Sequence, residues 1–323
     1  MTRISQRATG WIIVALAAAL ALPGLAQAQS TKPTVVTGAA ANVTPQSAQV
    51  LGKVTPNGAQ TTYVVQFGTT TLYTSSTPIA PAGAGTAAVA IVAALSPLAP
   101  ATTYHYRLVA RNRNGTVNGA DRVLKTKAQP LGLALVATPN PVALGRPTVL
   151  IGALTGTGNA NRQILLQSNP FPYTQGFAPT ANVQLTNERG EFAFPLLSVP
   201  VNTQYQVLIP NRPEVASPIV TVGVALRIAT NTSATRVRTG RVVRFFGTVR
   251  PARAGARYAI QHRRGARWVT VAGGATRGSA GGVTRYAERV RIRRGGSYRV
   301  FVTAADGNFV SAAGRTVKIS RIF

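Results

Sequence analysis

Short runs in which apolar and polar residues alternate make up the chain after residue 30, and Gly, Pro, Asn and Thr separate them. The segments RVVRFFGTVR (241–250) and SYRVFVTA (297–304) are two examples. Alternation between neighbouring positions predicts strands that bury one face, and no stretch shows the helical period of about 3.6 residues. The pattern therefore predicts an all-β fold.

Two stretches rich in Pro and polar residues divide this pattern, KTKAQPLG (125–132) and PNRPEVASP (210–218). We interpret both as linkers. The segments that they separate have about 100 residues each, which is the usual size of a β-sandwich domain. We therefore expect three tandem antiparallel β-sandwich domains, at residues 29–127, 128–222 and 223–323.

The first 28 residues have the organisation of a secretory signal peptide. Arg3 and Arg7 precede an apolar run at 11–22, and Ala26-Gln27-Ala28 forms a small-x-small cleavage site. The alternative is an uncleaved membrane anchor, but an anchor needs about 20 apolar residues and this run is shorter. We expect cleavage after Ala28, and a bacterial protein that is secreted or associated with the cell envelope, with no transmembrane span after cleavage.

The first domain carries a family resemblance at residues 98–112, LAPATTYHYRLVARN. The Leu-x-Pro-x-Thr-x-Tyr pattern in it resembles the corner before the F strand of a fibronectin type III domain. The resemblance implies that Leu98 and Tyr104 form a structural corner, with the Tyr104 hydroxyl returning to the backbone nearby. Alternation after the corner predicts that Tyr106 and Leu108 point inward.

The second domain resembles a secreted bacterial immunoglobulin-like sandwich. In TNERGEFAFP (186–195), Gly190 is expected to turn a hairpin, with Phe192 and Phe194 pointing one way. The third domain looks like a diverged copy of the second, because similar residues recur at nearly constant offsets of 95, 94 and 93 residues. These pairs are Gly152 and Gly247, Gln167 and Gln261, and Tyr205 and Tyr298.

Positive charge is concentrated in the third domain. The chain has 35 Lys and Arg against 6 Asp and Glu, a formal net charge of +29. Residues 223–323 hold 21 of the basic residues, with Glu288 and Asp306 as the acids, whereas the middle segment is close to neutral. A charge asymmetry of this size indicates an anionic partner.

The arginines of the third domain alternate with apolar residues. Arg244 shares a strand face with Arg250. A Gly-Gly turn at 295–296 would make the run 286–296 and the run 297–304 a hairpin, with Arg291, Arg293 and Arg299 stacked on neighbouring strands. Like charges on neighbouring strands repel unless a polyanion neutralises them, and guanidinium groups fit phosphate and carboxylate. We expect contacts to anionic cell-envelope polymers or lipid headgroups from Arg244, Arg250, Arg289, Arg291, Arg293 and Arg299.

A composition effect is the alternative explanation of this charge. Arg outnumbers Lys by 30 to 5 and accompanies many Ala and Gly residues, as in proteins from GC-rich genomes. A solvated basic face also protects an edge strand from aggregation.

The loop at 169–179, NPFPYTQGFAP, is a second candidate site. Its aromatic side chains, Phe171, Tyr173 and Phe177, would stack on sugars if they were exposed. The alternative is that the loop folds back over its own sandwich. A carbohydrate-binding accessory protein is therefore the second functional hypothesis.

Catalytic and metal chemistry has little support. The chain has no Cys and two His, and His105 and His262 lie in different domains without acidic or His neighbours, whereas a metal site needs three or four ligands. Neither a Gly-x-Ser-x-Gly motif nor a nucleic-acid-binding motif occurs. We expect a non-catalytic spacer or binding platform, without cofactor, metal or specific nucleic-acid partner.

Overall fold

The computed structural model describes residues 31–322, which form strands and loops without a helix. The predicted all-β fold is confirmed, whereas the predicted signal peptide lies outside the described residues. Across residues 31–322 there is accordingly no helix that could span a membrane. The chain divides into two compact units, of which the first ends at Lys127 and the second begins at Ala128.

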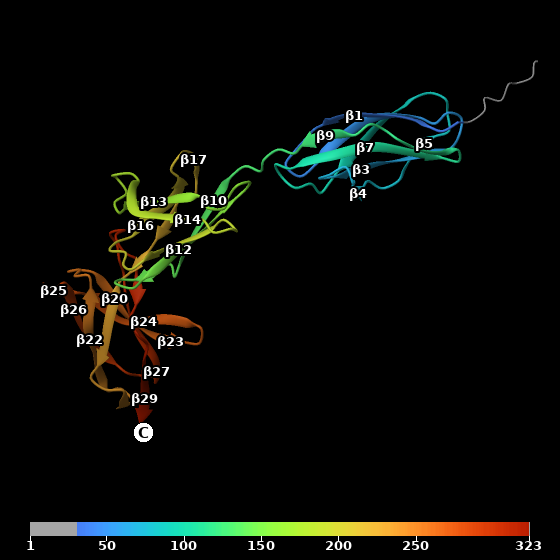
Figure 1. Cartoon of the computed structure of the whole chain (residues 1–323). Helices are drawn as coiled ribbons and strands as arrows, with labels where there is room; N and C mark the ends of the chain where they lie inside the picture. Colours follow the sequence, from blue (N-terminus) through green and yellow to red (C-terminus); the bar gives the residue numbers. More distant parts are fainter. Residues whose placement is uncertain (1–30, 323) are drawn as a thin grey trace, which may run out of the picture. The chain divides into compact units, whose positions relative to one another are not determined.

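The first unit is one β-sandwich, drawn in blue to green in Figure 1. Its smaller sheet has the strand order β1-β2-β6, and the larger has the order β4-β3-β7-β8, with β5 beside β3 and β9 beside β7. The strands are β1 (Thr34–Ala41), β2 (Ala48–Thr55), β3 (Thr61–Gly68), β4 (Ser75–Ser76), β5 (Ala80–Gly83), β6 (Val89–Leu95), β7 (Thr103–Asn112), β8 (Gly115–Asn118) and β9 (Arg122–Lys125).

The corner before β7 has the geometry that the family resemblance implies. The Tyr104 hydroxyl accepts a hydrogen bond of 2.9 Å from the Ala99 backbone N–H, and Leu98 is buried. Further along β7, Tyr106 and Leu108 are buried, as alternation predicts. This strand therefore anchors the core of the first sandwich.

The second unit contains two sandwiches, which we call the second and third sandwiches of the chain. The second sandwich has the sheets β10-β12-β15 and β14-β13-β16-β17, with β18 beside β16. Its strands are β10 (Gly132–Thr138), β11 (Val142–Ala143), β12 (Thr148–Thr155), β13 (Gln163–Pro170), β14 (Ala178–Leu185), β15 (Glu191–Leu196), β16 (Thr203–Ile209), β17 (Arg212–Ala216), β18 (Val220–Val222) and β19 (Val224–Ala225). The segment 210–218, predicted as a linker, is instead a β16–β17 hairpin, because the Leu208 and Ala216 backbones pair across it.

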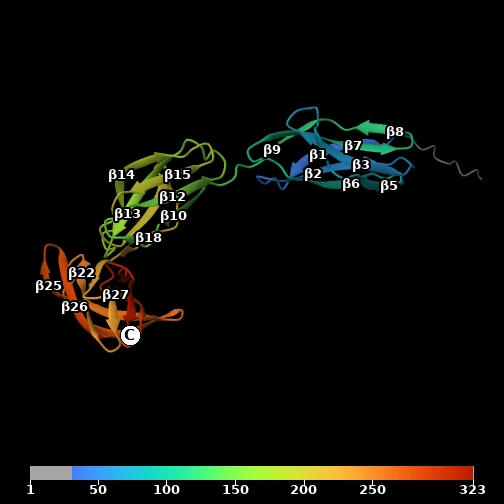
Figure 2. The ribbon, with the colours of Figure 1, turned by 90° about the horizontal axis from the view of Figure 1, so that it is seen from below.

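The third sandwich has the sheets β20-β22-β26-β25 and β21-β29-β27-β23-β24, with β28 beside β27. Its strands are β20 (Arg227–Thr232), β21 (Arg236–Arg238), β22 (Val242–Arg250), β23 (Arg257–Arg264), β24 (Arg267–Ala275), β25 (Arg277–Ala280), β26 (Val283–Arg291), β27 (Gly296–Val302), β28 (Ala312–Ala313) and β29 (Val317–Ile322). Strands β22, β26 and β25 lie side by side in both Figure 1 and Figure 2.

The same positions recur in all three sandwiches. A glycine lies in the central strand of each smaller sheet, on β2, β12 and β22. If any of these glycines carried a Cβ, that atom would overlap a buried side chain of the core. A glutamine on β3, β13 and β23 accepts a side-chain hydrogen bond across the larger sheet. These residues are Gly52, Gly152 and Gly247, and Gln66, Gln167 and Gln261. The internal repeat seen in the sequence thus has a counterpart in strand positions, and it extends to the first sandwich.

A strand rather than a flexible linker connects the second and third sandwiches. Val222, Val224 and Leu226 are buried, and the intervening residues face outward or are half-buried. β19 pairs in parallel with β11 through Val142 and Val224, and the Val310 N–H donates to the Val224 carbonyl at 2.8 Å. One hydrophobic cluster continues through this connection, so the boundary expected between residues 222 and 223 falls inside the second unit.

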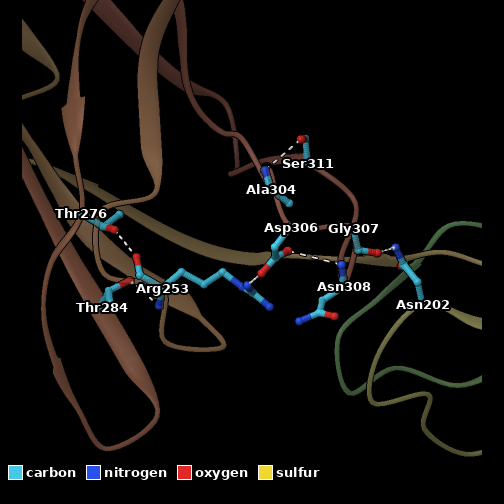
Figure 3. Close-up of polar contacts among 9 residues, drawn as sticks. All are labelled: Asn202, Arg253, Thr276, Thr284, Ala304, Asp306, Gly307, Asn308 and Ser311. Carbon is cyan, nitrogen blue, oxygen red and sulfur yellow. Dashed lines mark hydrogen bonds and ion pairs between the residues drawn. The ribbon is translucent and has the colours of Figure 1, made fainter. Parts of the chain in front are cut away.

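The loop at 303–311 of the third sandwich is held from both sides (Figure 3). From the second sandwich, the Asn202 side-chain amide donates to the Gly307 carbonyl at 2.7 Å. From the third sandwich, Arg253 forms an ion pair with Asp306. The Arg253 guanidinium also lies over the Phe309 ring. The loop is therefore part of the junction between the two sandwiches.

Two turns that were expected to make hairpins connect different sheets. The chain leaves β14 in one sheet and enters β15 in the other through the turn at Gly190, although Phe192 and Phe194 are both buried as predicted. Likewise, β26 and β27 belong to opposite sheets, so the segment at 295–296 is an arch over the core. The local sequence pattern does not distinguish a hairpin from an arch. In both, the strands before and after the turn bury alternate residues in the same core.

Tyr286 gives the second unit a pH dependence. Its hydroxyl donates to the Ala229 carbonyl at 2.9 Å, and burial raises its pKa to about 12. The unfolded chain releases this proton near pH 10, so stability is complete below that pH and is lost as the pH rises toward 12. The measurement is the free energy of urea unfolding at pH 9 and at pH 12. Between these two pH values it should fall by about 2 kcal/mol less in Tyr286→Phe than in the wild-type protein. An unchanged decline would contradict the assignment to Tyr286.

Candidate arginine-rich binding surface

Seven exposed arginines lie on the outer face of the sheet β20-β22-β26-β25, and we call this set the arginine face. They are Arg227, Arg244, Arg250, Arg277, Arg285, Arg289 and Arg291. The alternation of each strand produces the face. On β22, Val243, Phe245 and Val249 fill the core, which leaves Arg244 and Arg250 on the outside.

Strand register places six of these arginines directly opposite one another. The three cross-strand pairs are Arg227 with Arg250, Arg244 with Arg289, and Arg277 with Arg285. Residues directly opposite in an antiparallel pair have Cβ atoms about 5 Å apart, and like charges there are destabilising. A ligand that supplied negative charge would therefore relieve a repulsion built into the sheet.

The acids of the third sandwich do not neutralise this face. Glu288 has the opposite orientation on β26, where its carboxylate accepts a hydrogen bond of 3.3 Å from the Tyr258 hydroxyl. Asp306 is paired with Arg253 in the loop at 303–311. Between residues 31 and 322, no ion pair involves an arginine of the face.

The structure brings together four of the six arginines singled out from the sequence. Arg244, Arg250, Arg289 and Arg291 lie on the arginine face, and Arg293 is exposed just beyond the end of β26. Sequence reasoning missed Arg227, Arg277 and Arg285. Arg285 has the same alternation as Arg289, so that signal was present, whereas the other two become members only through their cross-strand partners.

Arg299 does not belong to this surface. It lies on β27 in the opposite sheet, because the expected hairpin is an arch. Its guanidinium Nε donates to the Gln261 side chain at 2.8 Å, and the group lies 4.3 Å from the centre of the Trp268 ring. Burial lowers its pKa. Arg107 has the same two contacts in the first sandwich, with Gln66 and Tyr73, which indicates a structural role for the position.

The three aromatic side chains of the loop at 169–179 are half-buried. Phe171, Tyr173 and Phe177 each retain only part of their exposure, and the Phe171 and Tyr173 rings meet edge to face, 5.4 Å apart. An added Cβ on Gly307 would lie 2.7 Å from the Phe171 ring, so Phe171 packs against the junction loop. The structure therefore does not present the three rings together as a flat stacking surface.

The two histidines have ordinary polar or packing contacts. His105 Nδ1 lies 2.8 Å from the Asp121 carboxylate, and hydrogen bonds from His105 and Tyr73 lower the pKa of Asp121. His262 is buried with its ring 4.5 Å from the Tyr298 ring. Within the part of the chain that the structure describes, no three His, Asp or Glu side chains converge as metal ligands would.

Comparison with known proteins finds likeness only among solved structures. No protein-family model matches the chain, and no curated protein matches its sequence. The FN1–FN3 domains of chicken CNTN1 share 15% identity over 90% of this chain and 100% of that chain, with a TM-score of 0.29. A tetra-tandem repeat from the extending region of a large adhesion protein shares 15% identity over 89% of this chain and 74% of that chain, with a TM-score of 0.27.

A third similar structure is the sensor domain of the anti-sigma factor RsgI4 in Pseudobacteroides cellulosolvens. It shares 19% identity over 29% of this chain and 89% of that chain, with a TM-score of 0.21. The fold assignment for this protein rests on its own strand order, which is that of stacked antiparallel sheets in each sandwich.

Proposed function

We propose that this is a non-catalytic, exported bacterial protein that binds anionic polymers or lipid headgroups of the cell envelope. In this proposal the third sandwich makes the contact, and the first two sandwiches extend or present it. The observation that carries the proposal is the set of three Arg–Arg cross-strand pairs on a face without acids. A surface that contacts only water gains no stability from such pairs, and each pair is destabilising in the absence of a counter-charge.

Salt dependence tests this function. The purified protein should co-sediment with isolated cell envelopes at low salt and should be released as salt rises, because bound arginines displace counterions from a polyanion. In a face variant, Arg244→Ser, Arg285→Ser and Arg289→Ser remove three charges. The slope of log affinity against log salt should then fall by about 2 to 3 units, if each contact contributes as it does on nucleic acid.

A control variant loses the same charge from the second sandwich. Arg146, Arg162 and Arg212 are exposed and lie away from the arginine face, so Arg→Ser changes there should leave binding within about twofold of wild type. Equal losses in both variants would reduce the effect to net charge and contradict a site on the face.

The carbohydrate-binding alternative predicts a different result. Binding to neutral glycans would ignore salt and would be lost when Tyr173 and Phe177 are replaced by Ala. Salt-insensitive binding that survives in the face variant would overturn the polyanion proposal in favour of this loop. The half-burial of these rings favours the arginine face.

A further inference from the structure

A long groove lies between β24 and β26, where the two sheets of the third sandwich separate. Two adjoining hollows of about 620 and 520 Å³ make up the groove. Residues 273–275 of β24 and 285–288 of β26 line the first, which extends over β22 to Asn231 of β20. Residues 270–272 and 289–291 of the same two strands line the second. At the usual rise of a strand, the groove is roughly 17 Å long. We call it the seam groove.

Strand geometry explains why the seam is open. β24 pairs with β23 and β26 pairs with β22, so the two strands belong to different sheets. A bulge at Val271 interrupts the β24 ladder, and bulges bend the strand that carries them. Beyond Arg285, β26 pairs only with β22 among the described strands, which leaves its other edge toward the groove.

The seam groove is strongly basic along its whole length. Eight arginines line it: Arg244, Arg264, Arg277, Arg285, Arg289, Arg291, Arg293 and Arg294. Glu288 is the one acid in its lining, and the Tyr258 hydroxyl and the Arg289 backbone N–H already donate to that carboxylate. Cationic walls of low dielectric concentrate the field between them and attract anions into the groove.

The backbone at the end of the groove is fixed before any ligand arrives. Ile292 is fully buried, and its N–H donates to the Arg241 carbonyl at 2.9 Å. The Tyr298 hydroxyl donates to the Arg294 carbonyl at 2.7 Å. The exposed side chains of Arg293 and Arg294 thus project from an ordered arch, and a ligand would have to order only the side chains.

We propose that the seam groove binds a single extended chain of a polymer that carries repeated phosphate or sulfate groups. This inference rests on the polyanion-binding function proposed above and narrows the partner to a linear chain. The arginines follow the β26 side of the groove along about 17 Å, with Arg264 on β23, and a row of this kind fits a row of anionic groups. Guanidinium forks bind such oxyanions through paired hydrogen bonds. Five of the eight groove arginines also belong to the arginine face, so a flat bilayer would reach these five, but it would not enter the groove between the strands.

Two variants with equal charge loss separate the groove from the flat face. Arg293→Ser with Arg294→Ser removes two charges from the groove, whereas Arg227→Ser with Arg250→Ser removes one cross-strand pair that does not line it. The probe is long-chain inorganic polyphosphate, titrated calorimetrically into the full protein. We expect the groove variant to bind about tenfold or more weakly. The flat-face variant, whose pair belongs to the arginine face but lies outside the groove, should lose less, about threefold.

Two further measurements make the outcome decisive. Tripolyphosphate should bind the wild-type protein at least tenfold more weakly than the long chain, because it occupies only part of the groove. Equal affinity for the two phosphates, or an equal loss in the two variants, would overturn the linear-chain proposal. This length comparison uses the unmodified protein and does not depend on how the variants fold.

Vesicles that contain phosphatidylglycerol distinguish this proposal from the broader function. Tighter binding to vesicles than to polyphosphate, lost in the flat-face variant, would assign the surface to a membrane and refute the groove while leaving the proposed function intact. If neither probe binds at low salt, the proposed function itself fails.

Discussion

Gly247→Ala is expected to destabilise the second unit by about 3 kcal/mol, at the upper end of what overpacking a core costs. A Cβ at this position would overlap the carbonyl oxygen of Ala229 on β20 and would lie 2.8 Å from the Tyr286 hydroxyl. Because the Ala229 carbonyl oxygen belongs to the backbone, removing this overlap requires a shift of β20 and not merely a new side-chain rotamer. The change also breaks the hydrogen bond from Tyr286 to Ala229.

Urea unfolding at neutral pH measures this effect, with Gly132→Ala as the control. At Gly132 an added Cβ would meet only the Thr155 side chain, at 3.4 Å, so the control should change stability by less than about 1 kcal/mol. Similar stabilities for the two variants would show that β20 can move freely away from β22. In that event, the close packing of the smaller sheet would not explain the recurrent glycine.

Asn202→Ala is expected to cost about 2 to 4 kcal/mol, because it removes two hydrogen bonds and leaves a buried donor without a partner. Asn202 is buried, and its Oδ1 accepts the Val224 N–H at 2.7 Å while its Nδ2 donates to the Gly307 carbonyl at 2.7 Å. Val224 is fully buried in the connecting strand. The loss therefore falls on the junction between the second and third sandwiches.

The signature of this substitution is a change in cooperativity as well as in stability. Trp268 is the one tryptophan after residue 30, so its fluorescence reports on the third sandwich, whereas circular dichroism reports on all strands. The two transitions should lie further apart in Asn202→Ala than in the wild-type protein. They should keep the wild-type separation in the control Asn211→Ala, which changes an exposed loop of the same unit. The wild-type separation in both variants would show that the two sandwiches remain coupled without Asn202, and would contradict its role at the junction.

Local patterns in the sequence predicted well which residues of a single strand are buried and which are exposed. The alternation of Tyr106 and Leu108, and of Arg244 and Arg250 on β22, reappears in the burial of these residues. The Tyr104 corner was predictable because its partner, Ala99, is only five residues away in the chain. Signals of this kind depend on neighbours in sequence, and the physics that produces them is equally local.

Relations between strands were predicted less well. Arg299 was expected beside Arg291, but the chain crosses from one sheet to the other at 295–296. Short turns between apolar strands occur in hairpins and in arches alike, and only the packing of the whole sandwich distinguishes them. For the same reason the pairing of Arg227 with Arg250 was not visible, because register depends on contacts between distant segments.

The segment at 210–218 shows how composition can mislead. Three prolines and several polar residues suggested a linker, yet β17 is an exposed edge strand, a place where proline is tolerated because its missing N–H faces solvent. The true connection, at 220–226, is apolar at every second position and so resembled an ordinary strand.

Because that connection is itself a strand, only changes of its length by an even number of residues preserve which side chains face the core. Val222, Val224 and Leu226 point into the core, and the positions between them do not. Inserting or deleting one residue there would exchange the two sets and turn the apolar side chains toward water, whereas a change of two residues would preserve the alternation. Homologous chains that keep this junction should therefore differ in length here by even numbers, and any engineered spacer between the sandwiches should follow the same rule.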